Sequence, residues 1–206
     1  MLSWIEENSG LVQAMMAAVT ALVWIVYLHI IVTGLRRQRC TEILINLGGE
    51  RSFSARALVS NLGFEPVYIL EIILTVWGRD GKRTSSVIDR AELAEAERHT
   101  PSEATLQGPL KSGDYVDIGS IANLLERDRL QSFDQFDLEE ISRIEITVAA
   151  ITAAANSIVA AKRSFRSAQK NGSSCLVPET LYARQIRSSR GRKSIERQIR
   201  ELGEVS

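Results

Sequence analysis

The hydrophobic pattern of the chain changes character near residue 40. From Leu11 to Leu35 the chain runs for 25 residues without Asp, Glu, Lys or Arg. At a rise of about 1.5 Å per residue, such a helix is roughly 37 Å long, enough to cross a bilayer core of about 30 Å with some tilt. The pattern therefore predicts a transmembrane helix over residues 11–35.

Two other interpretations of this segment fit less well. A buried core helix typically needs only about 10–14 apolar residues. A cleavable signal peptide carries its basic residues before a shorter apolar core. Here Glu6 and Glu7 precede the segment, and the basic residues Arg36, Arg37 and Arg39 follow it. The flanks favour a spanning helix.

The same basic flank predicts an orientation. Residues 1–10 contain no Lys or Arg, whereas Arg36, Arg37 and Arg39 lie just after the span. Basic residues near a span tend to stay in the cytoplasm. We expect a short extracytoplasmic N-terminus (1–10), a basic linker (36–42) and a cytoplasmic remainder, in the plasma membrane or, in a prokaryote, the inner membrane.

Small residues mark one face of the predicted span. Ala14, Ala17, Ala18 and Ala21 share a helical face, which favours close helix–helix approach and a homo-oligomer. Alanine is also simply common in membrane helices, so self-association stays open. His29 is the one ionisable side chain of the span other than tyrosine, and without a relay partner it does not indicate a proton pathway.

After the linker the pattern becomes extended, with short apolar runs separated by turn residues. Ser120 is positioned to cap a short helix over 121–128, and residues 90–103 and 132–142 are polar connectors. Runs rich in β-branched and aromatic residues predict strands at 43–47, 55–60, 66–77, 84–89, 105–107 and 115–118. Asp80-Gly81 is expected to form the hairpin turn between the third and fourth of these strands.

Residues 143–166 are ambiguous between an Ala-rich helix and a β-hairpin. In the strand interpretation Ile144, Ile146, Val148 and Ala150 alternate inward. A turn at 155–157 would then return the chain. The alternation favours the hairpin, although the helix stays open.

Short strands at this spacing predict an antiparallel β-sandwich of immunoglobulin-like architecture over residues 43–181. A hydrophobic content of 45% is enough for a real core. The Cys–Trp–Cys pattern of true immunoglobulin domains is absent. The two cysteines, Cys40 and Cys175, provide no disulfide framework, in agreement with a reducing compartment.

The net charge of zero hides an asymmetry. Residues 36–161 carry 14 basic and 19 acidic side chains, whereas residues 162–200 carry 11 basic and two acidic ones. Serine and glycine in the middle of the basic tail (182–206) indicate flexibility, and Ile195, Ile199 and Leu202 recur at helical spacing. The candidate residues for contact with an anionic surface are Arg184, Arg187, Arg190, Arg192, Lys193, Arg197 and Arg200.

A basic tail can contact anionic lipid, nucleic acid or an acidic partner, and it can also remain simply solvated. Tethering to a membrane favours lipid or a membrane-bound partner over nucleic acid.

Motifs for catalysis are missing from the sequence. C-x-x-C, H-E-x-x-H, G-x-S-x-G and Walker-type glycine patterns do not occur, and the histidines are His29 and His99 alone. The acidic cluster Asp134, Asp137 and Glu139–Glu140 lies in a polar connector, where solvated charge is the usual outcome. We expect no enzyme, cofactor or metal.

Two functions agree with this organisation. One is an adaptor that presents a cytoplasmic β-domain to a protein partner. The other is an accessory or regulatory subunit of a membrane assembly that acts through its transmembrane helix.

Overall fold

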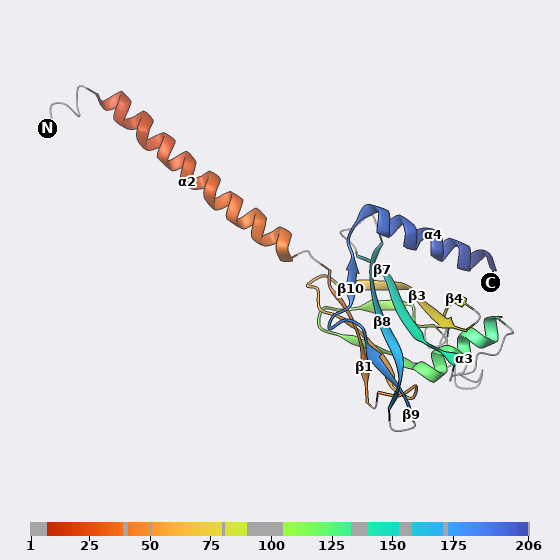
Figure 1. The fold of residues 1–206 in the computed structure, drawn as a ribbon. Helices are drawn as coiled ribbons and strands as arrows, with labels where there is room; N and C mark the ends of the chain where they lie inside the picture. The colour runs from red at the N-terminus through yellow and green to blue at the C-terminus, as the bar shows by residue number, and fades with distance from the viewer. Residues whose placement is uncertain are drawn as a thin grey trace. The chain divides into compact units, whose positions relative to one another are not determined.

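The computed structural model describes residues 8–38, 41–49, 51–79, 81–89, 105–132, 140–152, 158–170 and 173–205. The chain divides into two compact units, Met1–Cys40 and Thr41–Ser206. In the described residues, the first unit is one long helix, and the second is a mainly antiparallel β-domain with two helices (Figure 1).

Helix α2 (Ser9–Gln38) contains the apolar segment. Its window Ser9–Gly34 has a mean hydropathy of 2.3, and none of it is buried within the structure. Among the described residues it is the one helix long and apolar enough to cross a membrane. A signal sequence near the N-terminus would meet the same criteria. So large an apolar surface requires a cover of lipid or protein.

The β-domain contains two sheets whose strand pairs are all antiparallel. The small sheet has the order β1-β2-β6, and the large sheet has the order β10-β8-β7-β3-β4, with β5 beside β3 and β9 beside β8. The strands are β1 (Ile43–Gly48), β2 (Arg56–Asn61), β3 (Val67–Gly78), β4 (Gly81–Ser86), β5 (Gly108–Leu110), β6 (Tyr115–Ser120), β7 (Arg143–Thr152), β8 (Val159–Lys170), β9 (Ser173–Pro178) and β10 (Arg184–Ile186).

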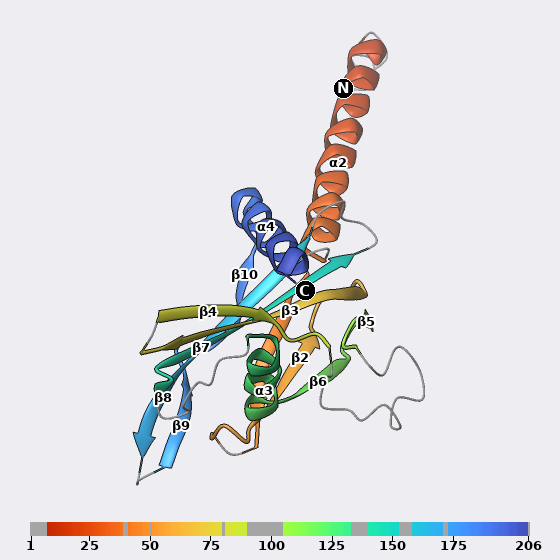
Figure 2. The ribbon, with the colours of Figure 1, turned by 90° about the vertical axis from the view of Figure 1, so that its right-hand side faces the viewer.

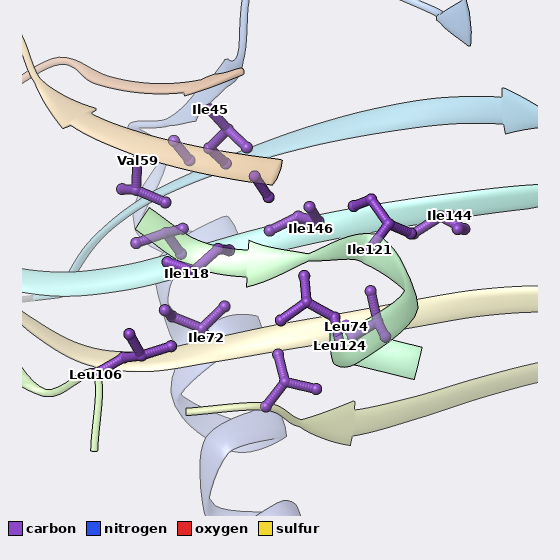
Figure 3. Close-up of a cluster of buried hydrophobic side chains, with 14 of the residues drawn as sticks. Ile45, Val59, Ile72, Leu74, Leu106, Ile118, Ile121, Leu124, Ile144 and Ile146 are labelled. Carbon is purple, nitrogen blue, oxygen red and sulfur yellow. The ribbon is translucent and has the colours of Figure 1, made fainter. Parts of the chain in front are cut away.

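The hydrophobic core lies between the two sheets. Figure 3 shows side chains of the small sheet, such as Ile45, facing Ile72 and Leu74 of the large sheet. Helix α3 (Ile121–Ser132) contributes Ile121 and Leu124 to the same cluster. The core thus joins both sheets and α3.

A β-bulge in β3 sets which of its residues face the core. Val67 and Ile69 are buried before the bulge, and Ile72, Leu74 and Val76 are buried after it. Because side chains alternate between faces, inward positions that change from odd to even require one extra residue. The irregularity lies between Ile69 and Glu71.

The β-hairpin prediction for residues 143–166 is confirmed. Strands β7 and β8 pair from Arg143↔Arg166 to Ala150↔Val159, and the four predicted inward residues of β7 are all buried. The turn expected at 155–157 lies outside the described residues. The hairpin between β3 and β4, which the Gly78↔Gly81 pair closes, is also confirmed.

The helix after Ser120 is present, since the Ser120 hydroxyl accepts a hydrogen bond from the Asn123 amide at 3.1 Å. It continues to Ser132, four residues beyond the predicted end. The predicted strand at 105–107 is wrong. Thr105 forms only an isolated bridge with Asp89, and the strand is β5, with Pro109 inside it. Proline is tolerated there because β5 is a short edge strand.

Helix α4 (Ser189–Val205) closes the domain. It lies on the face of the large sheet opposite to α3 and the small sheet (Figure 2). The serine and glycine residues that suggested flexibility, Gly191 and Ser194, belong to its first turns. The polar insertion at 90–103 and most of the connector at 132–142 lie outside the described residues.

Candidate functional site

The outer face of the large sheet, away from the core, is polar along its central strands. Outward residues come from alternate positions of β3, β4, β7 and β8, because the two faces of a strand alternate. The registers place these outward neighbours side by side: Lys82–Trp77–Arg143, Thr84–Thr75–Glu145–Ser164 and Thr147–Lys162–Arg184.

Glu145 is the centre of a polar network on this face. Its Oε1 accepts a hydrogen bond from Lys162 Nζ at 3.1 Å, and its Oε2 accepts one from the Ser164 hydroxyl at 2.9 Å. Arg143 donates to the same hydroxyl at 2.9 Å and forms an ion pair with Glu179 at 3.0 Å. The carboxylate of Glu145 is therefore neutralised by its own neighbours.

Helix α4 covers one part of this face through a small apolar contact. Ile195 is buried against Ala149 and Ala160, with Ile199 packed beside them. A Cβ added at Gly191 would lie 2.7 Å from the Ile186 methyl Cγ2. Glycine thus permits the first turn of α4 to approach β10 closely.

Beside this contact the helix and the sheet enclose a cavity of about 530 Å³, which we call the α4 cleft. Hydroxyl and amide groups from both sides reach it, among them Thr75, Thr147, Ser194 and Gln198. Its ionisable lining residues are Lys82, Glu145, Lys162, Arg184 and Arg187. A second cavity of about 620 Å³ shares Lys82, Ser194 and Gln198 and continues along α4 toward β4.

Four cations and one carboxylate give the cleft lining a net charge of +3. Glu145 already accepts a hydrogen bond from Lys162. Within the part of the chain that the structure describes, Lys82, Arg184 and Arg187 form no ion pair with an acidic residue. The Lys82 ammonium lies 5.7 Å from the centroid of the Trp77 ring.

The structure separates the seven basic residues that the sequence placed in one tail. Arg184 lies on β10 and Arg187 in the segment before α4, and both line the cleft. Arg190, Lys193 and Arg200 are exposed on α4 and line neither cavity. The other two, Arg192 and Arg197, are also on α4, and Arg197 borders the second cavity.

The remaining predicted site residues belong to the N-terminal unit. Ala14, Ala17, Ala18 and Ala21 are exposed on α2, as is His29. Arg36 and Arg37 fall in its last turn, whereas Arg39 lies outside the described residues.

The acidic cluster lies outside the described residues except for Glu140, which forms an ion pair with Arg79 at 3.2 Å. In the described ranges no group of three His, Cys, Asp or Glu side chains could hold a metal ion.

The sequence interpretation missed Lys82 and Lys162 as site residues. The alternation that turns Ile144 and Ile146 inward turns Glu145 outward, but nothing in the chain gave the register of β7 against β8, which brings Lys162 to it. The alternation in β4 also places Lys82 outward, and only the position of α4 turns that face into a cleft.

No family model matches this chain, and comparisons with curated proteins and with solved structures found no match.

Proposed function

We propose that this chain is a single-pass membrane protein whose β-domain is a cytoplasmic binding module of the adaptor type. The observation that carries the proposal is the apolar window of α2, 26 residues with none buried. A helix of about 20 apolar residues already spans a bilayer core, and lipid would cover the surface that the protein leaves bare.

The cytoplasmic location of the domain rests on the basic residues after the span. Arg36, Arg37 and Arg39 oppose translocation of the segment that they begin, because the bias of Lys and Arg near a span sets its orientation. No basic residue competes at 1–10.

We further propose that the domain is an immunoglobulin-like sandwich. Its strand order supports this, since β1-β2-β6 faces β4-β3-β7-β8 across one core. That order corresponds to strands A, B and E on one sheet and C′, C, F and G on the other. Helix α3 then occupies the connection between E and F. Sandwiches of this type commonly bind partners through loops and sheet edges.

The alternative function is an accessory subunit that works through its span. The face of Ala14, Ala17, Ala18 and Ala21 supports it, because small residues allow close helix packing in membranes. In this alternative the β-domain regulates the membrane assembly, and the contacts that hold the assembly together lie within the bilayer.

A labelling experiment tests the proposed topology. Ser3 and Ser173 are replaced singly by Cys in a background without Cys40 and Cys175, and intact cells are treated with a membrane-impermeant thiol reagent. We expect labelling at position 3 and none at position 173 until the cells are permeabilised. The reverse pattern would overturn the orientation, and release of the chain by alkaline carbonate would overturn the anchor.

Replacing residues 9–34 by an unrelated apolar helix separates the adaptor from the subunit. Proteins cross-linked to the β-domain in native membranes are compared between the wild-type and exchanged chains. An adaptor keeps the same cross-linked partners after the exchange. Loss of all of them would favour the subunit.

A further inference from the structure

We propose that the α4 cleft binds a phosphomonoester, that is, a phosphate group carried by a small polar molecule. All the residues that line the cleft belong to the unit Thr41–Ser206. The inference therefore stands whether or not α2 crosses a membrane, and it names a ligand that the adaptor function does not.

Cations line both sides of the cleft without an acidic partner among the described residues. Arg184 and Arg187 lie on β10 and in the segment before α4, whereas Lys82 lies on β4, at the other edge of the large sheet. Like charges that line one cleft repel one another. A bound anion would relieve this repulsion.

Phosphate fits these cations better than other anions do. A phosphomonoester carries a charge of about −1.5 to −2 at neutral pH and has three strong acceptor oxygens. The guanidinium groups of Arg184 and Arg187 can each donate two parallel hydrogen bonds to such oxygens, and Lys82 adds positive potential from the other side of the cleft. A carboxylate would neutralise only about half as much of the charge.

The first turn of α4 lies at the rim of the cleft. The Gly191 amide donates to the Ser188 hydroxyl at 3.1 Å, and both residues line the cavity. The positive end of the dipole of this 17-residue helix therefore adds to the field of the side chains.

The size and lining of the cleft describe the rest of the ligand. Its volume of about 530 Å³ lies within the usual range of about 300–1,000 Å³ for ligand sites and exceeds the needs of a bare phosphate. The hydroxyls of Thr147 and Ser194 and the amide of Gln198 suit a polyol. A soluble sugar-type phosphate and the phosphorylated headgroup of an inositol lipid share this chemistry.

The binding experiment uses the full chain in neutral detergent. Inositol monophosphate is titrated calorimetrically, with inositol as the probe that lacks phosphate. We expect binding of the first and none of the second. The double variant Arg184→Gln/Arg187→Gln should weaken binding at least about tenfold, since it removes two charge-assisted contacts. Arg187→Gln gives the same test without a change in a strand.

The matched control is Lys193→Gln/Arg200→Gln, which removes the same charge from α4 outside the cleft. We expect its affinity to stay within about twofold of the wild type, because contacts rather than net charge hold the ligand. No heat with inositol monophosphate, equal binding of inositol, or an equal loss in the control pair would overturn the proposal. Circular dichroism checks that each variant is folded.

A competition arm distinguishes the two sources of the ligand. Nanodiscs of phosphatidylcholine with phosphatidylinositol monophosphate are compared with nanodiscs of phosphatidylcholine alone. If the phosphorylated lipid displaces inositol monophosphate from the wild type, the source is a headgroup. If it does not, the ligand is a soluble phosphomonoester, and the site itself stands in either case.

Discussion

Arg163 lies on the inner face of β8, where the edge of the small sheet approaches the large one. It donates hydrogen bonds to the Ile45 carbonyl at 2.6 Å and to Asn46 Oδ1 at 3.1 Å. Its second terminal nitrogen reaches the carbonyls of Thr180 and Leu181. Burial lowers the pKa of this guanidinium, and its partners in these bonds are neutral. One side chain thus ties β1, β8 and the segment before β10.

Arg163→Met should destabilise the domain by about 2–4 kcal/mol, because it leaves buried carbonyls without their charged donor. Arg166→Met on the same strand is the control, since Arg166 is exposed and should change stability by less than about 0.5 kcal/mol. Urea unfolding of the full chain in detergent, followed by circular dichroism, measures both. Equal midpoints for the two variants would contradict the role of Arg163.

Glu71 follows the bulge of β3 and is half-buried. Its Oε1 accepts hydrogen bonds from the Ser86 hydroxyl at 2.6 Å and from the Ile72 amide at 3.0 Å. Burial nevertheless raises the pKa of the Glu71 carboxyl, because desolvation outweighs these two bonds. The folded protein therefore binds a proton here more tightly than the unfolded chain does.

Protonation of Glu71 should consequently stabilise the fold. Relative to Glu71→Gln, which keeps the acceptor oxygen, the wild type should be least stable near neutral pH. Its relative free energy of unfolding should rise as the pH falls through the raised pKa toward the ordinary carboxyl range. Unfolding curves of the wild type and Glu71→Gln across this window test the sign. If the wild type became less stable relative to Glu71→Gln as the pH falls, the raised pKa of Glu71 would be contradicted.

At the scale of elements, the docking of α4 depends on a close approach. The first turn needs Gly191, where an added Cβ would also lie 2.9 Å from the Ser188 hydroxyl that caps the helix. Gly203, near the other end, has nothing within 4 Å of an added Cβ. The same substitution therefore has opposite consequences at the two positions.

Gly191→Ala should loosen the first turns of α4, whereas Gly203→Ala should tighten the helix by up to about 1 kcal/mol through propensity. Amide hydrogen exchange across residues 189–205 measures both effects. Faster exchange in the first variant and slower exchange in the second is the expected result. Slower exchange in both variants would show that Ile186 and Ser188 can move to make room for the added methyl group without loss of stability.

Periodicity predicted most elements of the domain, because burial on one face leaves a pattern in the strand itself. The inward residues Ile144, Ile146 and Val148 are the clearest case. Strands β5, β9 and β10 escaped prediction. The three residues of β5 and of β10 are too few for a period. Their pairing is decided by contacts distant in sequence, such as the hydrogen bonds between Gln185 and the Ile43 backbone.

The candidate site was less predictable than the fold for the same reason. Local sequence identified a run of basic residues between 182 and 200, but charge alone does not specify which face of a folded element each occupies. Two contacts determine which face each basic residue occupies: β10 pairs with β8, and Ile195 packs on Ala149. They turn Arg184 and Arg187 into the cleft and leave Arg190, Lys193 and Arg200 on the exposed side.

At the scale of the whole molecule, the separation of the basic residues between the α4 cleft and the exposed side of α4 changes how contact with a membrane should be tested. An isolated peptide of the tail would lack the sheet that β10 joins and the surface that α4 covers. The exposed cations Arg190, Lys193 and Arg200 project from a helix whose apolar side is already occupied. Any contact with lipid through them is therefore electrostatic and does not require insertion.

We expect these three residues to hold α4 near an anionic leaflet when the chain is anchored in it. Each Lys or Arg close to such a surface contributes about 1 kcal/mol, and the attraction decays over a Debye length of about 8 Å at physiological salt. A fluorophore at Glu204→Cys, in a background without Cys40 and Cys175, should transfer energy to acceptor-labelled headgroups in proteoliposomes. The transfer should be higher with anionic than with neutral lipid and should fall as salt is added.

Replacing Arg190, Lys193 and Arg200 together by Gln should remove the dependence on both salt and anionic lipid. Arg184→Gln, which changes the cleft instead, should preserve it, so the two sets of cations are tested separately. If α2 anchors the chain as proposed, the local concentration of lipid is high, and weak attraction then suffices for a stable contact. Equal transfer in neutral and anionic proteoliposomes would show that α4 stands away from the membrane.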